Sequence, residues 1–150
     1  MADYLRKLTQ SCRDRGIGQH IHLSESQGEM ESIAKEHDGM TPIRYADSLG
    51  VFDVPAIVAH CVYATEEDIR IMKEKDVSVV LCPKSNMKLG NGFAPAQKML
   101  DAGINVCLGT DGCGSNNSLN MFAEMTAAGL VYKGATRQVQ CVPAGEVLKM

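Results

Sequence analysis

Short apolar runs alternate with helix-like segments along almost the whole chain, and this alternation constrains the fold more than any other feature. We expect four strands, at residues 20–23, 56–62, 77–82 and 104–109. Segments with helical spacing of apolar residues separate these runs. Chains with this order fold as α/β domains in which right-handed crossovers join parallel strands. The sequence therefore predicts one domain over residues 1–150.

The segments between the strands give further expectations. Thr65 is followed by three acidic residues, which is typical of a capped helix N-terminus. Continuous apolar character at residues 56–62 predicts a strand buried on both faces. Residues 83–92 are polar and contain glycine, so we expect an ordered loop, with a turn and a helix N-cap as the alternative. The expected helices cover residues 3–15, 29–37, 41–49, 65–75, 94–102 and 118–133, and another begins at Pro143.

Residues that carry chemistry follow the strands and do not precede them. His22 ends the first run, with Glu25 three residues later; His60 ends the second run and Asp111 follows the fourth. In α/β folds the carboxyl ends of parallel strands form the site. Two histidines and an aspartate at this edge suit a metal ion and proton transfer. For His60, a buried imidazole bonded to a neighbouring carbonyl is the alternative.

The other histidines and the polar segment after Asp111 are less informative. His20 and His22 lie two apart on a strand, so both face the same side. We interpret His20 as a structural residue one layer deeper, and His37, at a charged helix end, as solvent-exposed. Residues 115–118, Ser-Asn-Asn-Ser, are either a helix cap or a loop that contacts a substrate.

Composition narrows the partners. Fifteen basic residues are scattered among eighteen acidic ones, for a net charge of −3, which predicts no nucleic-acid partner. No apolar run approaches the roughly 20 residues that cross a bilayer, which predicts no membrane partner. Six cysteines occur without a CxxC pair. We therefore expect free thiols in a reducing cytoplasm. Because neither a nucleic acid nor a membrane is expected as a partner, the expected partner is a small-molecule substrate.

Several spaced motifs together resemble the amidohydrolase superfamily, nearest to its branch of 5-methylthioadenosine/S-adenosylhomocysteine deaminases and related chlorohydrolases. The resemblance runs from about Leu5 to the C-terminus. It implies an α/β fold of the parallel (β/α)8 TIM-barrel type, of which this chain supplies about the last four βα units. The motifs are His22-x-x-Glu25, Ala59-His60-Cys61, Pro83-x-Ser85-Asn86-x-x-Leu89-x-x-Gly92 and Gly109-Thr-Asp111-Gly-x-x-Ser115-Asn116-Asn117.

The resemblance also implies a reaction and its residues. His22 and Asp111 bind one divalent metal, zinc, with Fe²⁺ as the alternative. Asp111 is also the general base towards the attacking water, Glu25 shuttles a proton to a ring nitrogen, and His60 orients or polarises the water. Glu25, Asp111 and Ser115 contact the substrate. The implied function is zinc-dependent hydrolytic deamination of an adenosine-type nucleoside, with release of ammonia.

Two departures from the family pattern shape the remaining expectations. No strand with an H-x-H pair precedes His22, and Leu81 stands where many members have a histidine. We therefore expect a C-terminal half-barrel fragment that is inactive in isolation. Other amidohydrolase reactions, namely guanine or cytosine deamination and triazine dechlorination, are alternatives. So is a non-catalytic half-barrel that forms a homo-oligomer through its exposed sheet edges.

Overall fold

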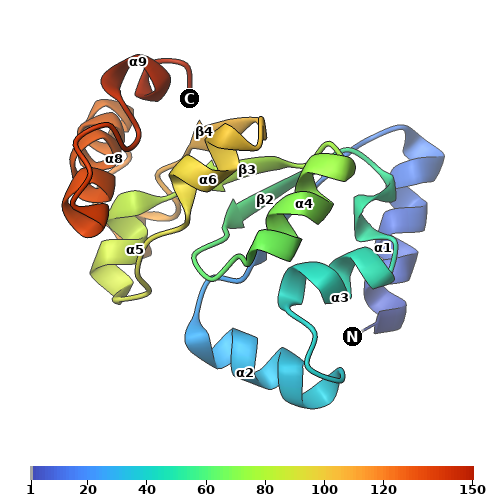
Figure 1. Cartoon of the computed structure of the whole chain (residues 1–150). Helices are drawn as coiled ribbons and strands as arrows, with labels where there is room; N and C mark the ends of the chain where they lie inside the picture. The colour runs from blue at the N-terminus through green and yellow to red at the C-terminus, as the bar shows by residue number, and fades with distance from the viewer. Residues whose placement is uncertain (1) are drawn as a thin grey trace.

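A computed structural model describes residues 2–150 and contains a four-stranded parallel sheet with helices (Figure 1). The strands are β1 (Gln19–Leu23), β2 (Ala56–His60), β3 (Ser78–Leu81) and β4 (Val106–Leu108). They lie in the order β1-β2-β3-β4, so each strand pairs with the next one along the chain. All four carboxyl ends therefore lie at one edge. The predicted α/β fold with parallel strands is confirmed.

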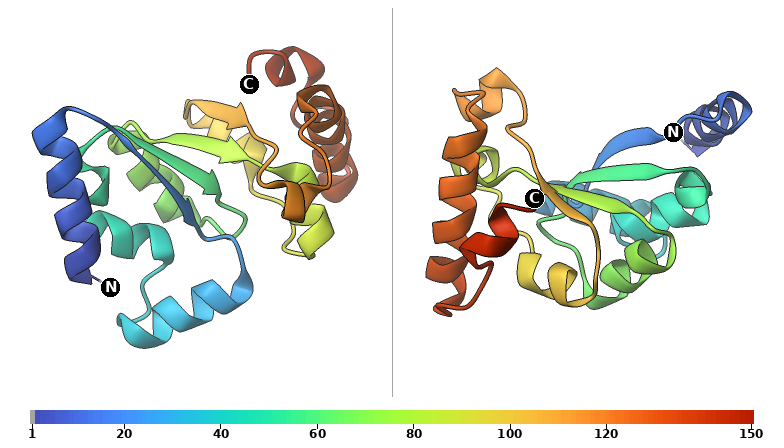
Figure 2. Two further views of the ribbon diagram at one scale, coloured as in Figure 1. Left: turned by 180° about the vertical axis from the view of Figure 1, so that it is seen from behind. Right: turned by 90° about the horizontal axis from the view of Figure 1, so that it is seen from above.

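The helices are α1 (Ala2–Arg15), α2 (Gln27–Glu36), α3 (Pro42–Ser48), the short 3₁₀ helix η1 (Val51–Asp53), α4 (Glu66–Glu74), α5 (Pro83–Leu89), α6 (Ala96–Asp101), α7 (Cys113–Asn116), α8 (Met121–Thr136) and α9 (Ala144–Val147). Helices α3, α4 and α6 cover one face of the sheet, while the opposite face is open between α1 and α8 (Figure 2). No helix within residues 2–150 is long and apolar enough to cross a bilayer.

The core lies between the sheet and the helices that cover it. Val58 and Val79 are fully buried there, together with Met72 of α4 and Met99 of α6. Full burial of one such side chain contributes about 1.5–3 kcal/mol. On the opposite face Ile57 is 41% exposed, so the prediction that this strand is buried on both faces is wrong. Among the described residues, no second layer covers that face.

The start of α4 shows how local sequence fixes one of these helices. Thr65 Oγ1 accepts a hydrogen bond from the backbone N–H of Asp68, and the Asp68 carboxylate accepts one from the Thr65 N–H at 2.8 Å. This capping box satisfies two N–H groups that a helix start leaves unpaired. The fully buried Asp68 carboxylate also accepts from Thr41, the N-cap of α3. The capped helix predicted at Thr65 is confirmed.

Several predicted segments have different bounds or types in the structure. Residues 83–89 form helix α5, so the predicted loop is wrong, whereas the alternative, a turn with a helix start, is closer to the structure. Strand β2 ends at His60, two residues before the predicted end, because His60 and Cys61 both have positive φ. Helix α8 begins at Met121 behind the N-cap Asn120, not at residue 118.

Candidate active site

The carboxyl edge of the sheet brings together three of the predicted site residues. His22 is in β1, His60 ends β2 and Asp111 follows β4. Their ligand atoms, one from each residue, all lie within 4.8 Å of one another. The imidazole rings of His22 and His60 meet edge to face, with centroids 4.7 Å apart. Side chains from three different strand ends therefore converge on one point.

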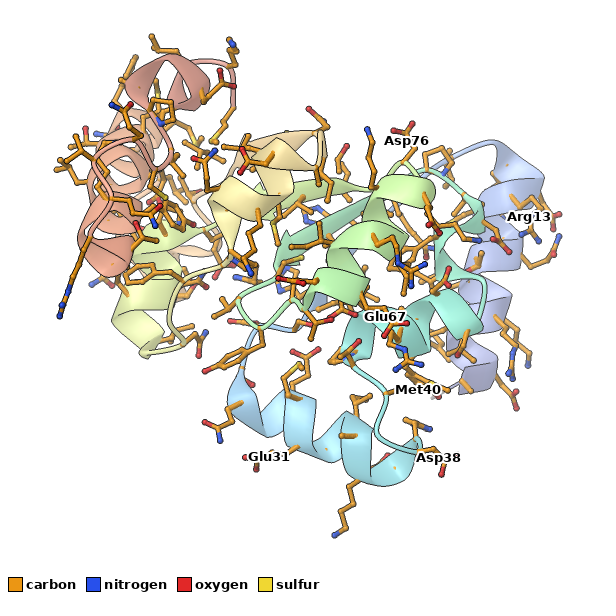
Figure 3. All side chains as sticks on the ribbon, viewed as in Figure 1. Arg13, Glu31, Asp38, Met40, Glu67 and Asp76 are labelled. Atoms are coloured by element: carbon orange, nitrogen blue, oxygen red, sulfur yellow. The ribbon has the colours of Figure 1, made fainter. Side chains whose placement is uncertain are left out.

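Many of the other carboxylates lie on the outer surface. Glu31, Asp38 and Glu67 are exposed on outer helices and turns (Figure 3). Within residues 2–150, the set of His22, His60 and Asp111 is the one group of metal-ligating side chains that gathers this closely.

Unusual backbone conformations aim the site residues. His60 (φ 71°), Asp111 (φ 60°) and Ser24 (φ 54°) all occupy the left-handed region, which non-glycine residues adopt rarely. Each such residue costs on the order of 1–3 kcal/mol and persists only where its surroundings hold it. Part of that support is the hydrogen bond from the Tyr63 N–H to the Ser24 carbonyl at 2.9 Å. Each conformation ends or follows a strand and turns the chain at the site.

His60 is almost fully buried, with 1% of its surface exposed. Its Nδ1 lies 3.0 Å from Oδ1 of Asn86, which is buried in α5. This contact anchors the imidazole ring through Nδ1. Nε2 lies 3.7 Å from Oε2 of Glu25. The ring is thus held by one nitrogen and presents the other to the site.

The carboxylate of Asp111 is also held from two sides. Its Oδ2 accepts hydrogen bonds from Ser85 Oγ of α5 and Ser115 Oγ of α7, both at 2.6 Å. Partial burial alone would raise the pKa of Asp111. The bonds from Ser115, Ser85 and the Gly112 backbone, together with the charge of His60, outweigh burial and lower this pKa to about 2. Asp111 is therefore ionised at neutral pH.

Glu25 stands over the other residues on the loop that follows β1. Its Oε1 accepts a hydrogen bond from Asn91 Nδ2 at 3.0 Å. The loop itself is fixed by Glu29, whose carboxylate accepts from the backbone N–H groups of Ser24 and Glu25 at 3.0 and 2.8 Å. Glu25 is therefore a positioned carboxylate beside His60.

The donor set fits a divalent metal. Two imidazoles and one ionised carboxylate are usual zinc ligands at about 2.0–2.2 Å, and donors within 4.8 Å of one another need only a small closure to share one ion. The thiols of Cys61 and Cys82 are buried. Burial raises the pKa of Cys61 well above its usual range and, with the charge of Asp111, raises that of Cys82 to about 12. Both thiols stay protonated, and all six cysteines are free.

Two histidines differ from expectation. His20 lies one step deeper on the same strand face as His22, with ring centroids 6.0 Å apart, but it is exposed and not a satisfied core residue. His37 is partly buried and stacks on Tyr45 with centroids 3.7 Å apart, so its prediction as a solvent-exposed side chain is wrong. Neither residue joins the group of three.

Residue types alone did not predict the amides and hydroxyls that hold the site residues in place. Ser85 and Asn86 contact Asp111 and His60, and Asn91 contacts Glu25. All three come from the segment that was expected to be a loop. The available signal was the pair Ser85-Asn86 directly after a strand and a proline, which places both residues in the first turn of a helix above the sheet edge.

Comparison with known proteins gives the site a context. The amidohydrolase family matches the chain over residues 1–150. The 5-methylthioadenosine/S-adenosylhomocysteine deaminase of Moorella thermoacetica is 46% identical over 148 residues, which are 99% of this chain and 34% of that protein. The 5'-deoxyadenosine deaminase of Methanocaldococcus jannaschii is 50% identical over 128 residues, 85% of this chain and 30% of that protein.

A solved structure agrees with these sequence matches. The crystal structure of an adenosine deaminase from Xanthomonas campestris with bound zinc superposes with a TM-score of 0.92 and 31% identity. The match covers 99% of this chain and 34% of that one. The chain thus spans about a third of the length of the proteins that it resembles.

Proposed function

The chain belongs to the amidohydrolase family, and from this premise we propose that the whole protein deaminates an adenosine-type nucleoside, such as 5-methylthioadenosine or S-adenosylhomocysteine. The observation that carries the proposal is the convergence of His22, His60 and Asp111 within 4.8 Å. The names of the Moorella and Methanocaldococcus relatives support the nucleoside class.

His22 and Asp111 would hold one divalent metal, with His60 beside it. Zinc is the proposed ion, supported by the bound zinc of the Xanthomonas structure, and Fe²⁺ is the alternative. When bound, such an ion lowers the pKa of water to about 7 and polarises the reacting centre. The remaining chemistry falls to side chains of this chain.

Asp111 takes a proton from the attacking water, which its ionised state and its position between Ser85 and Ser115 support. His60 orients that water through Nε2. A C–O bond forms between the water oxygen and the amino-bearing carbon. Glu25 carries the remaining hydroxyl proton to the purine ring nitrogen, and Asp111 gives the proton that it took to the amino group. The C–N bond then breaks and ammonia leaves. An adenine thereby becomes a hypoxanthine.

Substrate contacts are proposed for Glu25, Asp111 and Ser115. The Ser115 hydroxyl donates to Asp111, and its lone pairs remain free to accept from a substrate donor. Guanine, cytosine and triazine substrates are the alternatives, because the residues that line the rest of the pocket decide among them. The 150-residue chain by itself is proposed to be inactive, since two strong donors, His22 and Asp111, leave the ion weakly held.

A substrate panel tests the proposed function. We expect the full-length protein, supplied with zinc, to release ammonia from 5-methylthioadenosine, S-adenosylhomocysteine or 5'-deoxyadenosine, and to lose this activity after chelation. Guanine, cytosine and a chlorotriazine serve as comparison substrates. Turnover of one of these three without turnover of any adenosine derivative would favour the corresponding alternative and refute the nucleoside assignment.

The open sheet supports a proposal about assembly. Strands β1 and β4 are the edges of the sheet, and Ile57 is 41% exposed on its open face. Unpaired strand edges invite pairing with another chain. We expect the isolated 150-residue chain to sediment as a dimer or larger species at micromolar concentration. A folded monomer at that concentration would contradict edge pairing.

The free cysteines support a cytoplasmic location.

A further inference from the structure

Helix α8 carries a fully buried carboxylate, Glu124, that does not reach the ligand cluster. A buried charge is costly unless hydrogen bonds and partners compensate it. Here each carboxylate oxygen has a partner. Oε1 accepts from Asn116 Nδ2 at 2.6 Å, Oε2 accepts from the backbone N–H of Lys84 at 3.2 Å, and the Lys84 ammonium lies 3.9 Å away.

The contact with Lys84 places Glu124 at the start of α5. The N-cap of that helix, Cys82, makes no side-chain capping bond. Glu124 accepts from the Lys84 N–H instead, so a carboxylate from another helix performs the capping and lies where a helix N-terminus favours negative charge. The two residues that follow Lys84 are Ser85, which bonds Asp111, and Asn86, which bonds His60.

The contact with Asn116 places Glu124 at the loop that bears Asp111. Asn116 Nδ2 donates both to Glu124 and to the carbonyl of Thr110 at 2.5 Å. Thr110 immediately precedes Asp111, whose left-handed backbone (φ 60°) needs support from its surroundings. One buried carboxylate therefore joins the segment that carries Ser85 and Asn86 to the segment that carries Asp111.

We propose that Glu124 is a positioning residue that fixes Asp111 and His60 relative to each other by holding α5 and the β4–α7 loop together. The inference rests on the proposed function of the same site. Glu124→Gln keeps the size of the side chain but replaces one acceptor oxygen by a donor. That donor then faces either the Lys84 N–H or the Asn116 amide, so one of the two links breaks.

The test compares Glu124→Gln with Asp68→Asn in the full-length protein. Asp68 is an equally buried carboxylate that caps α4 but makes no bond to α5 or to the loop. Zinc affinity is measured by competition with a chromophoric chelator, alongside the unfolding midpoint, kcat and KM. We expect zinc binding of Glu124→Gln to weaken about 10–100-fold, as for other groups that orient metal ligands. Its kcat should fall with little change in KM, whereas Asp68→Asn should lower only the unfolding midpoint.

Unchanged zinc affinity and kcat in Glu124→Gln would overturn the proposal, as would an equal loss of affinity in Asp68→Asn. If Glu124→Gln does not fold, Asn116→Ala cuts only the link to the loop and is judged by the same criteria. A wild-type protein that binds zinc but deaminates no nucleoside would refute the proposed function alone. A wild-type protein without zinc affinity would overturn both.

Discussion

Asparagine at position 111 is expected to lower kcat for nucleoside deamination by about 10²–10⁴-fold, the usual contribution of a positioned general base. The substitution preserves size and left-handed backbone preference, because asparagine tolerates positive φ. It removes the negative charge that Ser85 and Ser115 hold in place. Ammonia release by the full-length protein at saturating substrate gives the measurement.

The matched control is Asp101→Asn. Asp101 is exposed at the end of α6. Within residues 2–150, its side chain accepts a hydrogen bond only from Gln97. Its replacement should leave kcat unchanged. An Asp111→Asn enzyme that retains more than about a tenth of wild-type kcat would exclude Asp111 as the base, since even the smallest effect expected of such a group is about 10²-fold.

Replacement of His60 by alanine is expected to lower kcat by about 10²–10³-fold, as loss of one preorganised group at a reacting centre does. The physical reason is that Asn86 holds Nδ1, so that Nε2 is fixed towards Glu25 beside the proposed ligands His22 and Asp111. Because His60 has φ 71° and is buried, His60→Asn serves as a second variant that tolerates this backbone. Both variants should retain the secondary structure measured by circular dichroism.

His37→Ala is the control for this substitution. His37 stacks on Tyr45 and is not part of the group of three. We expect a small loss of stability and no loss of kcat. If His60→Asn is folded and turns over as fast as His37→Ala, then His60 is a core residue without a part in the reaction.

The sheet could be predicted because the strands are apolar and the helices between them have apolar residues at helical spacing. Consecutive strands pair in parallel, so their carboxyl ends lie together. The convergence of His22, His60 and Asp111 at these ends could therefore be predicted too. The positive φ values of His60 and Asp111 were not, because neither residue type requires such a backbone. Those conformations are imposed by contacts between distant segments.

Helix α5 was missed for a related reason. Its polar residues Ser85 and Asn86 point into the protein and are fully buried, so the helix lacks the usual contrast between an apolar and a polar face. Glu124 offered a similar signal that went unused. An acidic residue among the apolar residues of 121–132 indicates a buried partner, yet the identity of that partner, Lys84 and Asn116, depends on tertiary structure.

Anomalous diffraction at the zinc edge from crystals of the full-length protein, grown with zinc, tests the site most directly. We expect one strong peak at about 2.0–2.2 Å from an imidazole nitrogen of His22 and a carboxylate oxygen of Asp111, with His60 beside it. A zinc ion bound by other residues, with His22 and Asp111 free of it, would contradict the assignment of the active site to the carboxyl ends of the strands.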